Sequence, residues 1–348
     1  MNAAGKRLRL LDGHEWIVAA YVVAALVLAR VHGFELDLGL VLDLRHDLIF
    51  LDLVVLCFAV HLLVDGTRAR RTASDRRAFG PAWRARVRRE VFTVQRAWDL
   101  IRALLLLKLL LVVYCNLKQA IFRMHPALFD DALRTWDVRL HGGLDPTALA
   151  LEYLGRPAVV RAFDCAYVAW YAIKAPVVIA FVLVRDRRLQ VRFFAAYFCL
   201  WIVGGLWAVA VPSLGPVFVQ PQRFAGLEMP IARGLQQELW TSYGRALASP
   251  AEYTTLIYEG IAAFPSLHVA VVALFALFLA RVHRGAALAM GAYTLVIQVG
   301  AVLLGWHYAV DGWFGIALAL TLWWAFVPPP PVGRARSPAE SSSSRPAA

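Results

Sequence analysis

Two stretches near the end of the chain decide the fold: residues 263–282 read AFPSLHVAVVALFALFLARV, and residues 307–327 read HYAVDGWFGIALALTLWWAFV. Each begins with a short polar motif and continues as an apolar run, and a helix of roughly 20 such residues crosses a bilayer. A helix places residues four apart on one face, so His307 and Asp311 are predicted to be neighbours. The two stretches therefore predict membrane helices with ionisable groups at their N-terminal ends.

The composition of the whole chain agrees with a membrane protein. Of the 348 residues, 60% are hydrophobic, whereas a soluble domain is about 45–50% apolar. The net charge of +12 would also suit a nucleic-acid partner. The basic residues, however, lie in loops between apolar runs, where the positive-inside rule accounts for them. We therefore expect the membrane, and no nucleic acid, as the partner.

Hydropathy predicts an all-α polytopic membrane bundle of about eight helices, with a six-helix catalytic core. Arg-rich loops alternate with acidic or Arg-poor loops, which places both termini in the cytoplasm. His268 and His307 then share one extracytoplasmic face of the plasma membrane. The predicted spans are 15–32, 47–64, 100–117, 157–184, 191–211, 264–282, 285–304 and 307–327.

The same pattern divides the chain into three regions. Residues 1–99 hold two spans and an Arg-rich cytoplasmic loop, and residues 100–327 form the catalytic membrane domain. Residues 328–348 are a Pro/Ser-rich tail with a composition typical of disorder. The Arg-rich segment 68–96 is predicted to be an amphipathic helix on the inner leaflet, with a solvated charge run as the alternative. Residues 231–247 are predicted to be an interfacial helix over the site.

The polar motifs predict acid–base or nucleophilic chemistry on an anion. Ser266 and His268 stand at a helix N-terminus, whose free N–H groups attract phosphate. Asp311 would orient His307 and stabilise its imidazolium, which suits a nucleophile, while His268 suits a general acid for the leaving oxygen. No cluster has metal-ligand spacing, so neither a metal nor a cofactor is predicted. A histidine that simply lies at the interface is the alternative for each motif.

The motifs resemble those of the type 2 phosphatidic acid phosphatase superfamily. Its second motif, Pro-Ser-x-His, matches residues 265–268, and its third motif ends in His-x-x-x-Asp, which matches residues 307–311. Residues 136–146, WDVRLHGGLDP, are similar to a segment of the inositol phosphorylceramide synthase-like branch and add Asp137 as a substrate-binding candidate. The resemblance covers roughly residues 125–325 and implies a phosphohistidine mechanism.

The sequence departs from this family where the phosphate would bind. Residues 300–301 are Gly-Ala, where the family often has Ser-Arg. A phosphate needs cations or N–H donors, and Arg223 is the first candidate to supply them. Arg161 and Lys174 in the fourth span are further candidates, and Asp164 in the same span is a substrate-binding candidate. Asp164 lies one turn after Arg161 and could instead pair with it, and Lys174 could extend towards the inner surface.

The resemblance favours a lipid phosphotransferase that moves a phospho-alcohol head group, of the phosphoinositol type, from a phospholipid to a hydroxyl acceptor. The first alternative is a phosphatase that hydrolyses phosphatidate or a polyprenyl phosphate, with water as the acceptor. The second is a non-catalytic membrane scaffold, which the missing Ser-Arg pair would allow.

Overall fold

The computed structural model describes residues 11–41, 47–72, 76–248 and 260–327, and every element in these ranges is a helix. The predicted tail 328–348 lies outside the described residues. The elements are α1 His14–His32, η1 Gly39–Val41, α2 Asp47–Thr72, α3 Arg76–Glu90, α4 Val94–Met124, α5 Asp130–Leu140, α6 Pro146–Leu154, α7 Pro157–Val168, α8 Trp170–Leu183, α9 Arg187–Ala210, α10 Pro216–Val219, η2 Pro221–Arg223, α11 Ala232–Ala248, α12 Leu267–Leu279, α13 Arg284–Leu303 and α14 Ala309–Phe326.

Six helices of the described chain are long and apolar enough to cross a membrane: α1, α4, the α7–α8 pair, α9, α13 and α14. The protein is therefore a multi-pass membrane bundle, but the predicted count of eight spans is not confirmed. The predicted span at 264–282 contains α12, which has only 13 residues. The predicted span at 157–184 is two helices that meet at Ala169.

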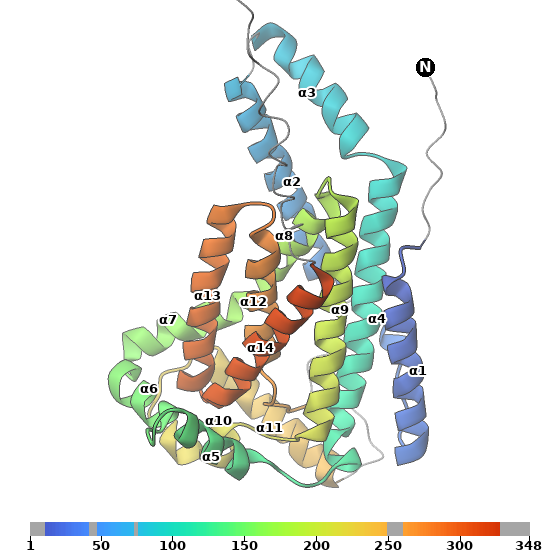
Figure 1. Ribbon diagram of the computed structural model, residues 1–348. Coiled ribbons are helices and arrows are strands. Elements are labelled where there is room, and N and C mark those ends of the chain that lie inside the picture. Colours follow the sequence, from blue (N-terminus) through green and yellow to red (C-terminus); the bar gives the residue numbers. More distant parts are fainter. Residues whose placement is uncertain (1–10, 42–46, 73–75, 249–259, 328–348) are drawn as a thin grey trace, which may run out of the picture.

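Helix α12 forms the centre of the core, which explains its composition. It packs against α9, α13 and α14, and Val269, Val272, Leu274 and Phe278 are fully buried. A helix that is apolar on all sides is stable when protein covers all of it. Helix α12 therefore lies inside the bundle, surrounded by other helices, although it is too short to cross a membrane by itself (Figure 1).

Helices α12 and α13 form an antiparallel hairpin that positions both histidine motifs. Residues 280–283 form its turn, with N–H groups bonded back to the carbonyls of the last turn of α12. The start of α12 and the end of α13 consequently lie at the same end of the bundle (Figure 1). His268 and His307 belong to this end.

A layer of short helices covers that end of the bundle. It contains α5, α6, α10 and α11 (Figure 1). The predicted interfacial helix at 231–247 is α11. The Arg-rich segment contains α3, which lies at the opposite end of the bundle. Helix α4 begins at Val94 and continues across the predicted domain boundary at residue 99.

Candidate active site

The ring of His307 is held by a backbone carbonyl. The chain leaves α13 through a turn at Gly305, where φ is +75°, a conformation that glycine adopts without strain. Nδ1 of His307 then lies 2.6 Å from the carbonyl oxygen of Ala263. A carbonyl can only accept a hydrogen bond, so Nδ1 carries the proton. The lone pair of the neutral ring is consequently on Nε2, the nitrogen that a nucleophile or base would use.

Asp311 joins the two motifs to each other. It is fully buried, and its Oδ2 lies 3.5 Å from Nδ1 of His307 and accepts the backbone N–H of Tyr308 at 2.9 Å. Its backbone carbonyl accepts the N–H of Ser266 at 3.0 Å. The predicted proximity of His307 and Asp311 is thus present, but the shorter contact that fixes the tautomer of His307 is with Ala263.

His268 faces His307 from the first turn of α12. The two rings have centroids 5.9 Å apart, and the ring of His268 also packs against Trp170 at 4.4 Å and Tyr167 at 4.9 Å. Ser266 caps the helix and is fully buried. Its hydroxyl has no hydrogen-bond partner among the described residues. Both histidines therefore face a shared space beside a helix N-terminus.

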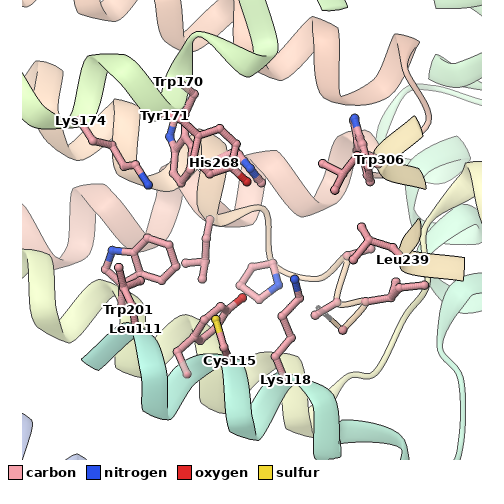
Figure 2. Close-up of a pocket in the computed structure, with 18 of the residues that line it drawn as sticks. Leu111, Cys115, Lys118, Trp170, Tyr171, Lys174, Trp201, Leu239, His268 and Trp306 are labelled. Carbon is pink, nitrogen blue, oxygen red and sulfur yellow. The ribbon is translucent and has the colours of Figure 1, made fainter. Parts of the chain in front are cut away.

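This space is a cavity of about 650 Å³ inside the bundle. Its walls are mostly aliphatic and aromatic, and Figure 2 shows Trp170, Tyr171, Trp201 and Trp306 around it. Its charged or ionisable groups include three lysines and the two histidines, and no Asp or Glu is among the described residues that line it. These five residues are Lys108, Lys118, Lys174, His268 and His307.

Asp137 and Asp164, the two acidic substrate-binding candidates, both accept hydrogen bonds from backbone amides. The carboxylate of Asp137 accepts the N–H groups of Ala309 and Val310 at 2.9 and 2.6 Å. Burial raises the pKa of Asp137, and the two N–H donors oppose that rise. The carboxylate of Asp164 accepts the N–H groups at residues 231 and 232, at 2.8 and 3.0 Å. These contacts fix the starts of α14 and α11.

The two predicted arginines lie outside the cavity lining and have acidic partners. Arg223 pairs with Asp145 at 3.0 Å, and Arg161 pairs with Glu228. The interpretation that Arg161 pairs with Asp164 is wrong, because Asp164 caps α11. Lys174, by contrast, lines the cavity together with His268 and His307.

Three features of the site were missed at the sequence level. The Ala263 carbonyl has no sequence signature, because any residue has a carbonyl. Asp130 accepts the N–H groups of Leu214 and Gly215 and the hydroxyl of Tyr308, contacts between distant segments. Lys118 could have been found, because a lysine within an apolar run is a functional candidate.

The described residues form a membrane bundle in which two histidines and three lysines line one mostly apolar cavity. A family model described as PAP2 superfamily matches residues 131–325, more than half of the chain, and the chain belongs to that superfamily. Members are generally phosphatases or phosphotransferases, so the protein is of the lipid phosphatase or phosphotransferase type. Comparisons with curated proteins and with solved structures gave no match.

Proposed function

We propose that this protein is a lipid phosphotransferase that moves a phospho-alcohol head group between lipids through a phosphohistidine at the extracytoplasmic face. The observation that carries the proposal is the Nδ1–H bond from His307 to the Ala263 carbonyl at 2.6 Å. It supports Nε2 as the nucleophile, because only that nitrogen of the neutral ring has a free lone pair.

The first chemical step forms the covalent intermediate. Nε2 of His307 attacks phosphorus, and the bond between phosphorus and the oxygen of the leaving diacylglycerol breaks. Protonated His268 gives its proton to that oxygen, which makes it a better leaving group. The charge of Asp311, 3.5 Å from Nδ1, stabilises the cationic ring of His307.

The second step returns the enzyme to its starting state. An acceptor hydroxyl attacks the phosphorus of the phosphohistidine, and neutral His268 takes its proton. The nitrogen–phosphorus bond breaks and its electron pair returns to Nε2 of His307. The N–H groups in the first turn of α12, which begins at Leu267, are free of intrahelical partners and suit the phosphate oxygens in both steps. Lys174 contributes positive charge from the cavity wall.

The cavity is suited to a lipid substrate. A volume of about 650 Å³ with apolar walls suits hydrocarbon as well as a head group. Hydrolysis of phosphatidate or a polyprenyl phosphate is the second candidate, because water can resolve the same intermediate. The two reactions differ only in the acceptor of the second step.

The test uses the purified full-length protein with phosphatidylinositol labelled in its phosphate. Acid-labile, alkali-stable label should appear on the protein and be missing from His307→Ala. With a lipid alcohol as acceptor, labelled new phospholipid and free diacylglycerol should form. Release of inorganic phosphate from phosphatidate would identify a phosphatase instead. No product and no labelled protein with either lipid would contradict the proposal and favour the scaffold alternative.

A further inference from the structure

We propose that Lys118 and Lys174 bind the lipid phosphate from two walls of the cavity, and so replace the phosphate-binding arginines that the sequence lacks. This inference rests on the proposed function, since it concerns the phosphate that reacts at His307. Lys118 belongs to α4 and Lys174 to α8. Figure 2 shows both ammonium groups extending into the cavity from different helices.

Lys174 is held close to the general acid by an aromatic ring. Its Nζ lies 3.8 Å from the ring centroid of Trp170 and 4.8 Å from that of Tyr171. The ring of Trp170 also packs against the ring of His268, with centroids 4.4 Å apart. An ammonium over aromatic faces is stabilised there and keeps hydrogen-bond donors for a further ligand. Lys174 is therefore positioned one ring away from His268.

Lys118 approaches from α4, one turn after Cys115. Its side chain is half-buried, and within the described residues it forms no ion pair or hydrogen bond. Both Lys118 and Lys174 lie close enough to His268 to interact with it electrostatically. Figure 2 shows Lys174 on the same wall as Trp170, Tyr171 and His268, whereas Lys118 extends into the cavity from α4 on the opposite wall.

The positive charge of the lysines that line the cavity favours binding of an anion. An ammonium buried in a membrane protein is costly unless it has a counter-charge, and no carboxylate is among the described residues of the cavity lining. Arg223 and Arg161 already have acidic partners. Lys108 lines the cavity too, but ten residues of helix place it about 15 Å from Lys118 along α4. A phosphate beside His268 would supply the counter-charge for Lys118 and Lys174 together.

Equilibrium binding to the full-length His307→Ala protein in detergent tests this assignment without turnover. The probes are dioctanoyl phosphatidate, dioctanoyl phosphatidylinositol and, as the phosphate-free control, dioctanoylglycerol. We expect Lys118→Met and Lys174→Met each to weaken binding of at least one phospholipid by about 10- to 100-fold, because a charge-assisted bond is lost. Binding of dioctanoylglycerol should change less than about twofold, and Lys118→Arg should retain most of the phospholipid affinity.

Lys108→Met is the matched control, since it removes the same charge from the same helix and cavity. Equal loss in Lys108→Met, an equal loss of dioctanoylglycerol binding, or unchanged affinity in the other two variants would overturn the assignment. So would a parent protein that binds neither phospholipid better than dioctanoylglycerol. Lysine-dependent binding without a phosphohistidine in the wild type would leave this inference standing and refute the proposed function alone.

Discussion

At the residue scale, two groups determine the protonation and the electrostatic environment of the His307 ring. The Ala263 carbonyl holds the proton on Nδ1 at 2.6 Å, and the Asp311 carboxylate lies 3.5 Å away. The carbonyl is itself placed by Ser213, whose carbonyl and hydroxyl accept the N–H groups of Ala263 and Phe264 at 3.0 and 2.9 Å. Asp311 is then free to act mainly through its negative charge.

Asp311→Asn separates charge from orientation. The amide oxygen can still accept the Tyr308 N–H, and the Ala263 carbonyl still fixes the tautomer, so the fold should be retained. Loss of the charge opposite the cationic ring should lower kcat by about 10²–10⁴-fold, with KM changed less than about threefold. Steady-state kinetics with thermal inactivation as the stability readout checks this. Asp131→Asn, at an exposed position of α5, is the control; an unchanged kcat for Asp311→Asn would contradict the role of the charge.

His268 is expected to behave differently from His307. A general acid is needed less when the leaving group departs easily. His268→Ala should therefore lose several orders of magnitude of activity on a natural lipid and much less on a p-nitrophenyl phosphodiester. His307→Ala should be inactive on both substrates. Near-normal activity of His307→Ala with complete loss in His268→Ala would mean that the two roles are reversed.

At the element scale, the distance between the motifs depends on how closely α12 and α14 pack. A Cβ at Gly315 would lie 2.6 Å from the Ser266 carbonyl oxygen and 3.3 Å from the Cβ of Ala270. Backbone from the start of α12 thus occupies the space beside Gly315. The glycine permits the approach that lets Ser266 bond to Asp311.

Gly315→Ala should push α12 and α14 apart. We expect a loss of stability of about 1–3 kcal/mol from overpacking, with an activity loss of at least tenfold as His268 moves away from His307. Gly291→Ala in α13 is the matched control, because nothing lies within 4 Å of a Cβ there. It should be neutral or slightly stabilising, as alanine is the better helix former. Equal behaviour of the two variants in thermal inactivation and activity assays would refute the packing argument.

The sequence predicted the positions of the helices better than the contacts between them. Hydropathy predicted α1, α9, α13 and α14 within a few residues, because the bilayer sets the length of an apolar run. It could not show that α12 is short and central. Motif spacing predicted that His307 and Asp311 are neighbours, and their side chains lie 3.5 Å apart. His307, however, precedes α14, which begins at Ala309, so the turn before the helix positions it. Motif spacing did not find the partner of Asp164, because residues 231–232 approach it only in the folded chain.

At the scale of the whole molecule, a buried ion-pair network ties three helices together at the end opposite to the site. Arg102 of α4 pairs with Asp12, with Glu15 at 2.8 Å and with Asp99 at 3.3 Å. Arg187 of α9 pairs with Asp12 and with Asp99 at 2.6 Å. Because Asp12 and Glu15 belong to the start of α1, the network connects α1, α4 and α9.

Arg102→Ala should leave Glu15 without its arginine partner and Asp12 and Asp99 with Arg187 alone. Breaking such a buried pair costs about 3–5 kcal/mol, so we expect faster thermal inactivation of the detergent-purified protein. Arg185→Ala is the control: its pair with Glu90 is exposed, and such pairs contribute about 0–1 kcal/mol. If both variants inactivate at the wild-type rate, the network does not stabilise the bundle.

The proposed orientation of the bundle rests on the arginines at the end that carries α3. Helix α11 covers the cavity at one end, and the Arg-rich α3 lies at the other (Figure 1). With the native cysteines replaced by serine, Gln237→Cys in α11 should react with an impermeant thiol reagent in intact cells. Arg71→Cys in α2 should react only after permeabilisation. The reverse pattern would place the site in the cytoplasm.

In the hairpin of α12 and α13, the number of residues in α13 determines where His307 lies relative to His268. Helix α13 contributes no histidine, yet it carries the chain from the turn at residues 280–283 to His307. Each residue added to a helix advances the chain by about 1.5 Å and rotates it by about 100°. One extra residue in α13 would therefore turn His307 away from His268 while every side chain kept its identity. Substitutions at lipid-facing positions of α13 should therefore be tolerated far better than insertions or deletions within the helix.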